Sequence, residues 1–83
     1  MKQMPTREQV QKAYASVHKY LRENTTGLSQ EELAERSGSS KDHQSRLECA
    51  DRGPSLFHFI KDAIAMGADP VLVLSMVLRH LGL

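Results

Sequence analysis

Apolar residues recur at helical spacing along most of the chain, and the first such pattern lies near its start. One stripe consists of Val10, Ala13, Tyr14, Val17 and Leu21. Thr6 and Gln9 precede it with the spacing of a capping box, in which each side chain accepts a hydrogen bond from the other residue's backbone N–H. This pattern predicts a helix over residues 7–23.

Two short helices are predicted next, beyond a linker turn at residues 24–27. Ser29 and Glu32 form a second capping box, and Gly38 can end that helix in the left-handed conformation. Ser40 can cap a third helix, which runs through Cys49.

The last two predicted helices are strongly apolar. Ser55 caps a helix over residues 56–66 whose apolar side chains cover more than one face, so we expect it to be the central core element. Asp69 and Pro70 open a fifth helix over residues 71–81. No stretch keeps the two-residue alternation of a strand, so the chain is predicted to be all-α, a compact five-helix bundle.

Chain length and net charge limit the number of domains and the way in which the protein could bind DNA. With 83 residues and 40% apolar content, the chain fits one domain over residues 1–83, close to the size at which a partner subunit would help stability. Lys and Arg number 11 against 10 Asp and Glu, a formal charge of +1. Any DNA binding must therefore come from the placement of charges and not from net charge.

Cysteine content and hydropathy favour a location in the cytosol. Cys49 is the single cysteine, which excludes an intrachain disulfide, fits a reducing cytosol and is expected to be a half-buried thiol. No apolar run follows Met1 and Lys2, and the longest apolar stretch, residues 71–78, is too short to cross a bilayer. We expect a soluble, cytoplasmic protein with no membrane partner.

Residues 28–48 have the pattern of a helix-turn-helix. This motif needs a small residue midway along its first helix, a residue that tolerates positive φ at the turn, and a large apolar anchor late in its second helix. Ala34, Gly38 and Leu47 stand at those three places. The segment therefore predicts two short helices that cross closely.

The match extends beyond this motif. From "YLRENTTGLSQEELAERSG" through "SRLE" to "RGPSLFHFIKDAIAMGADPVLVL", residues 20–74, the chain resembles the lambda-repressor/Cro-like helix-turn-helix family of phage repressors and bacterial transcription regulators. The resemblance implies a lambda-repressor-like DNA-binding domain whose third helix lies in the major groove of double-stranded DNA, with a homodimer on a pseudo-palindromic operator. It implies a transcriptional regulator at the nucleoid, more specifically a repressor of phage, plasmid or bacterial type.

Carried over residue by residue, the resemblance assigns contacts with DNA. Base contacts are expected on the outward face of the third helix, from Lys41, Asp42, Ser45 and Arg46, with His43 as a further candidate. Ser29 and Gln30 match family positions that hold a DNA phosphate, and we expect further phosphate contacts from Lys19, Arg22 and Ser40. Backbone N–H groups and the helix dipole favour an anion where Ser29 and Gln30 begin a helix, although Gln30 could serve only in capping.

The resemblance also pairs Arg22 with Glu48. An arginine fork can bind a carboxylate through two hydrogen bonds, so we predict a structural ion pair that fixes the third helix; two independent solvated charges are the alternative. Ser39 and Gln44 depart from the family, which usually has aliphatic residues packing inward there. Either Gln44 finds hydrogen-bond partners, or the third helix is shifted or loosely packed.

The fifth helix is apolar almost all round, and we predict that it forms the dimer interface over residues 70–82. The interface residues are expected to be Val71, Leu74, Val77, Leu78, Leu81 and Leu83. A fully internal helix in a monomer is the alternative.

The sequence contains no pattern typical of an enzyme, a metal site or a bound cofactor. Its four histidines, His18, His43, His58 and His80, do not have ligand spacing, and no base is evident beside Cys49. A second function class stays open, since fold alone does not decide function. On the same scaffold the protein could bind a protein partner as an antitoxin, antirepressor or anti-activator, with weak or no DNA binding.

Overall fold

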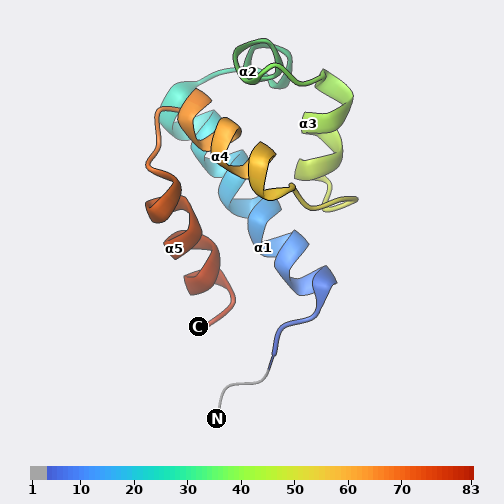
Figure 1. Ribbon diagram of the computed structural model, residues 1–83, viewed down its shortest axis with the longest axis vertical. Helices are drawn as coiled ribbons and strands as arrows, with labels where there is room; N and C mark the ends of the chain where they lie inside the picture. Colours follow the sequence, from blue (N-terminus) through green and yellow to red (C-terminus); the bar gives the residue numbers. More distant parts are fainter. Residues whose placement is uncertain (1–3) are drawn as a thin grey trace.

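The computed structural model describes residues 4–83, and within that range the chain forms helices and no strands (Figure 1). Residues 1–3, which include Met1 and Lys2 and belong to the domain predicted over 1–83, lie outside the described residues. In chain order the elements are α1 (Arg7–Tyr20), the π-helix η1 (Leu21–Thr26), α2 (Gln30–Ser37), α3 (Lys41–Glu48), α4 (Leu56–Ala65) and α5 (Pro70–His80). The all-α class and the five helices are as predicted.

Local sequence determines where the helices start. Both capping boxes are present, at Thr6 with Gln9 and at Ser29 with Glu32. Ser40, Ser55 and Asp69 each accept a hydrogen bond from a backbone N–H of the first turn of the helix that follows. These caps satisfy N–H groups that have no partner within the helix, which confirms the predicted starts.

The end of the first helix differs from the prediction. The α-helix stops at Tyr20 and the chain continues as the six-residue π-helix η1, which takes in most of the predicted linker. The Thr26 hydroxyl donates to the carbonyl oxygen of Arg22 at 2.7 Å and accepts from the Leu28 N–H at 3.1 Å. These hydrogen bonds extend the helical path beyond the residue at which sequence pattern would end it.

The hydrophobic core gathers around α1, which passes through the middle of the molecule (Figure 1). The apolar stripe predicted for this helix is buried from Ala13 to Leu21, but Val10 keeps 38% of its surface exposed. The Cα radius of gyration is 12.1 Å. That value is close to the roughly 12 Å expected of a compact chain of this length.

The role predicted for residues 56–66 is wrong. Only Ala63 and Met66 of this segment's apolar side chains are buried, and Phe59 is half-buried. Four others are exposed, at 76, 62, 39 and 64%: Leu56, Phe57, Ile60 and Ile64. Because α4 lies in the outer layer against α2 and α5, its neighbours cover one side of it, and its remaining apolar side chains form a surface.

Within residues 4–83, no helix combines the length and the apolar character that crossing a bilayer requires.

Candidate nucleic-acid interface

The predicted interface centres on α3, which local and tertiary contacts hold in place. Gly38, with a φ of 72°, ends α2 and turns the chain into α3, and the two helices pack against each other. Leu47 is 0% exposed and anchors α3 in the core. Beyond α3, the N–H of Asp51 donates to the Arg46 carbonyl at 2.9 Å, which closes the last turn.

Most of the residues predicted to contact bases lie on the outer side of α3, but the His43 ring packs against His58 of α4, with the two ring centroids 4.7 Å apart. Lys41, Asp42 and Arg46 are exposed, whereas His43 and Ser45 are half-buried. The buried residues of this helix are Gln44 and Leu47, on its inner side. Three of the five predicted residues are therefore exposed on this short helix, and the Arg46 side chain keeps 47% of its surface exposed.

Two neighbouring surface carboxylates accept hydrogen bonds from Arg46. Its Nε donates to Asp42 at 2.9 Å, and its Nη1 donates to Asp51 at 3.1 Å. Hydrogen bonding to Asp42 raises the pKa of Arg46 above its ordinary value. Arg46 must exchange these partners before it can contact a base, and such exposed pairs are individually weak.

The ion pair predicted between Arg22 and Glu48 is present and buried. Arg22 Nε donates to one carboxylate oxygen at 2.6 Å and Nη2 to the other at 2.8 Å, the two-bond geometry of an arginine fork. The Glu48 side chain is 4% exposed. Gln30 Nε2 also donates to Glu48, at 3.1 Å, so this carboxylate ties the end of α3 to both η1 and α2.

His18 is a member of this site that sequence pattern did not identify. It is 0% exposed, and its Nδ1 lies 3.1 Å from Glu48 Oε2 while its Nε2 lies 3.7 Å from Asp62 Oδ2. Two features of the sequence could have pointed to it. His18 is four residues from both Tyr14 and Arg22 on the same helical face, and Asp62 is the single acidic residue of the largely apolar segment 56–66.

Gln44 finds hydrogen-bond partners, which is the first of the two alternatives given for it above. The side chain is 0% exposed, and its Nε2 donates to the Ser39 hydroxyl at 3.0 Å and to Asp62 Oδ1 at 3.3 Å. Ser39 in turn shares a 3.0 Å hydrogen bond with the hydroxyl of Ser37. The polar residues at the two unusual positions therefore bond to each other and to α4, in place of aliphatic packing.

Charge in this buried region shifts two pKa values in opposite directions. Burial alone would raise the Glu48 pKa, but hydrogen bonds from Arg22, His18 and Gln30 outweigh it and lower the value to about 2. Burial alone would lower the His18 pKa, but Asp62 and Glu48 outweigh it and raise the value above 6.5. Both groups thus favour their charged forms.

The residues predicted to contact phosphate divide into two groups. Lys19, Ser29 and Ser40 are exposed. Arg22 is 8% exposed, and its third bond, from Nη1, goes to the Leu28 carbonyl at 2.8 Å, so its predicted phosphate contact is wrong for this conformation. The half-buried Gln30 gives its amide to Glu48, which makes it a partner of α3 and removes its side chain from the phosphate set.

The start of α2 carries negative charge that the predicted phosphate site did not take into account. Glu31 and Glu32 lie in its first turn, and both are exposed. The hydrogen bond from the Ser29 backbone lowers the pKa of Glu32, which keeps this carboxylate charged. A phosphate at this helix start would meet two carboxylates beside the free N–H groups.

No family model, curated protein or solved structure matches this chain. The assignment of a function therefore depends on the residues and geometry of this chain.

The predicted dimer surface is largely accessible, with one correction. Val71, Leu74, Leu78 and Leu83 are 75, 48, 39 and 39% exposed. Leu81 is half-buried and packs against the core. Val77 is 5% exposed and belongs to the core, because α5 turns this face towards α1, so its predicted place in an interface is wrong.

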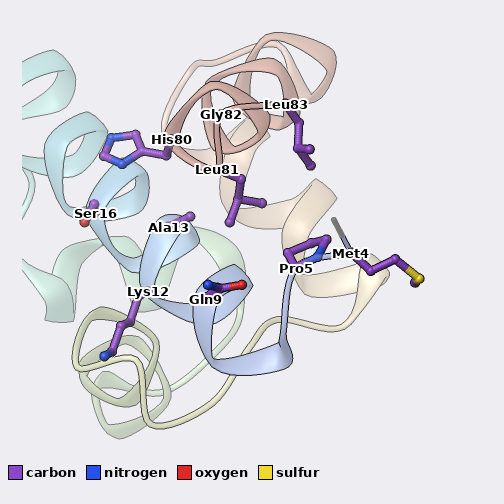
Figure 2. Close-up of a pocket in the computed structure, with 10 residues that line it drawn as sticks. All are labelled: Met4, Pro5, Gln9, Lys12, Ala13, Ser16, His80, Leu81, Gly82 and Leu83. Carbon is purple, nitrogen blue, oxygen red and sulfur yellow. The ribbon is translucent and has the colours of Figure 1, made fainter. Parts of the chain in front are cut away.

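Two hollows lie away from α3. One, of about 540 Å³, is lined by the start of α1 and the end of α5, with Lys12, His80 and Leu83 among its residues (Figure 2). The other, of about 670 Å³, is mainly apolar and lies where Leu56, Phe59 and Leu74 meet the start of α1. Neither includes a residue of α2 or α3.

The remaining chemistry concerns cysteine and metal ligands. Cys49 follows the last residue of α3 and is exposed and free, not half-buried as expected. Within residues 4–83, no group of three or more His, Cys, Asp or Glu side chains is placed to hold a metal ion.

Proposed function

We propose that this protein is a sequence-specific DNA-binding transcriptional regulator, most simply a repressor, in which α2, the turn at Gly38 and α3 act as a helix-turn-helix. One observation carries the proposal. Glu48 at the end of α3 is bound by Arg22, Gln30 and His18, while Lys41, Asp42 and Arg46 on the same helix stay exposed. A rigidly held helix with an accessible polar face is what reading base edges in the major groove requires.

The charges that support DNA binding are local. Lys41 and Ser40 stand exposed at the start of α3, and Lys19 is exposed near the end of α1. Asp42 and Asp51 oppose binding in the free protein but pair with Arg46 at the surface, where a phosphate or a guanine can replace them at modest cost. Affinity is expected to depend steeply on salt, because phosphate contacts release counterions.

A dimer fits this function and the apolar surface. Val71, Leu74 and Leu78 on α5 are exposed, and the exposed side chains of α4 add to them. Two copies joined through this surface would present two α3 helices to half-sites roughly 34 Å apart on a pseudo-palindromic operator.

The test is binding to DNA from upstream of the protein's own gene, measured by fluorescence anisotropy across a salt series. A scrambled duplex of the same length and composition is the control. Saturable binding that prefers the upstream duplex and weakens steeply with salt supports the proposal. Equal binding to both duplexes, or none at low salt, contradicts it.

A second function is favoured by a specific observation, the exposed apolar surface of α4 and α5 together with an α3 face whose Arg46 is already paired. On this alternative the protein binds a protein partner as an antitoxin, antirepressor or anti-activator. Absence of DNA binding at low salt, together with loss of a partner on mutation of α4 or α5, would favour it.

A further inference from the structure

Five buried polar side chains join the elements that hold α3, and we refer to them as the buried polar cluster. They are His18, Arg22, Gln44, Glu48 and Asp62. Three of them are 0% exposed. They come from α1, η1, α3 and α4, whereas the buried polar residues described in the structure include none from α5.

The charges of the cluster balance only when His18 is protonated. Arg22 neutralises Glu48 through two hydrogen bonds. Asp62 then has the His18 ring at 3.7 Å as its cationic partner, and otherwise a 3.3 Å hydrogen bond from Gln44. A buried carboxylate without a cation is strongly unfavourable, so loss of the His18 proton leaves Asp62 uncompensated between α1 and α4.

We propose that His18 is a proton-dependent latch that holds α3 firmly against α1 and α4 when protonated and loosens it when neutral. His18 can have this effect because it contacts both sides at once, Glu48 at the end of α3 and Asp62 on α4. The effect on DNA depends on the proposed function, but the latch itself requires no ligand.

The direction of the pH dependence follows from the contacts. The two carboxylates outweigh burial and raise the pKa of His18 above 6.5, so its stabilising charge is complete below 6.5. It is lost as pH rises through the raised value. The latch is therefore closed in mildly acidic solution and opens towards alkaline pH.

Other titratable groups that face His18 do not reproduce this behaviour. Tyr14 packs on its ring at 5.5 Å, and burial raises the pKa of the phenol far above 10, so it stays neutral. Arg22 stays charged throughout, because its hydrogen bond to Glu48 raises its pKa. His43 on α3 is the other histidine that could change α3 with pH. Burial lowers its pKa below 6.5, so His43 titrates at lower pH than His18.

The experiment is an NMR titration of the full chain between about pH 5.5 and 8.5, which follows the His18 ring and the amide-exchange protection factors of α3 and α5. We expect the His18 midpoint to lie above 6.5. Protection in α3 should fall across this midpoint, by roughly tenfold for each unit by which the pKa is raised. Protection in α5 should fall less than protection in α3, since α5 adds nothing to the buried polar cluster.

Two variants and one control sharpen the test. Asp62→Asn should move the His18 midpoint down and weaken the pH dependence of α3, and His18→Gln should abolish that dependence. His80→Gln, at an exposed position on α5, should leave it as in the wild type. A His18 midpoint at or below pH 6.5 overturns the latch, and so do α3 protection factors that do not change across the His18 midpoint. Both outcomes are read from the wild type, so they hold even if His18→Gln does not fold.

DNA binding is measured separately over the same pH range. If the protein binds its operator, affinity should fall across the His18 midpoint in the wild type but not in His18→Gln. If it binds no DNA at any pH, the proposed function fails, and the NMR titration still decides the latch.

Discussion

At the scale of single residues, Glu48 is the side chain on which the position of α3 depends most. It accepts hydrogen bonds from Arg22, Gln30 and His18, three groups from three elements. Removing one partner of a buried ion pair leaves the other charge uncompensated, which costs more than the pair itself contributes. Substitution of Glu48 should therefore lower both the stability of the protein and its affinity for DNA.

We expect Glu48→Gln to lower the free energy of unfolding by about 3 kcal/mol at neutral pH, because Arg22 stays buried without a carboxylate. Urea denaturation followed by circular dichroism measures this. The matched control is Glu23→Gln, since Glu23 is exposed and lies 3.9 Å from the same guanidinium. That control should cost about 0.5 kcal/mol or less. Equal effects of the two changes would remove the special role of Glu48.

The contribution of Glu48 should also depend on pH. Its pKa falls from 4.5 to about 2 in the folded protein, so its stabilising effect is complete above 4.5 and lost as pH drops towards about 2. His18 acts in the opposite sense and loses its contribution above 6.5. Stability should therefore be greatest between these limits. A difference between wild type and Glu48→Gln that stays constant from pH 5 down to about 2 would contradict this account.

Arg46 is the residue on which base recognition is expected to depend. Arg46→Ala should weaken specific operator binding by about 1–3 kcal/mol, the cost of losing a good base contact. Anisotropy titrations against operator and scrambled duplexes measure the change. Arg36→Ala, an exposed arginine in the last turn of α2, is the control for loss of one positive charge. If both variants weaken binding equally, Arg46 contributes charge alone.

At the scale of elements, α2, α3, α4 and α5 end in the same way, and α3 has an alanine where the other three have a glycine. The chain beyond α2 and beyond α3 returns two N–H groups to the last turn, through Gly38 and Ser39 and through Ala50 and Asp51. The first residue of each pair has positive φ, 72° at Gly38 and 58° at Ala50. Glycine adopts this conformation freely, whereas the Cβ of alanine makes it strained.

Ala50→Gly should therefore raise the free energy of unfolding by about 0.5–1 kcal/mol, because relief of strain exceeds the added flexibility of the unfolded chain. Gly38→Ala is the reciprocal control and should lower it by about 1–2 kcal/mol. Both are measured by urea denaturation. Destabilisation by Ala50→Gly would mean that the alanine methyl group makes packing contacts worth more than the strain.

The helix starts and the end of α2 were predictable, whereas the end of α1 and the burial of the helices were not. Caps such as Ser29 with Glu32 act within four residues, so the sequence is enough to locate them. The ion pair of Arg22 with Glu48 joins residues far apart in the chain, and only the family resemblance placed it. The pairing of His18 with Asp62 had no such guide, because it depends on how α1 and α4 cross.

At the scale of the whole molecule, several large apolar side chains of α4 and α5 are exposed, and a contiguous apolar patch of this kind commonly marks an interface. Their side chains such as Leu56, Phe57 and Val71 remain in water in the single chain. A second copy is the occupant that the proposed function favours, since one dimer would pair the two α3 helices on DNA.

Leu74→Glu should convert a dimer at tens of micromolar into a monomer that still unfolds cooperatively, because its position is 48% exposed. Sedimentation equilibrium measures the mass. Thr25→Glu, an exposed position in η1, is the control for added charge and should leave the dimer intact. Val77→Glu should instead unfold the chain, since this residue is in the core. A wild-type monomer at these concentrations would rule out the dimer.

The sequence by itself determined the helical class, the caps that start each helix and the turn at Gly38, because each depends on hydrogen bonds and torsion angles within a few residues. Tertiary structure alone decided which apolar faces are covered, and it exposed Leu56 and buried Val77. It also decided which charges meet, and brought His18 between Glu48 and Asp62. Burial and charge pairing are properties of neighbouring elements, and periodicity along one helix does not specify which neighbour covers it.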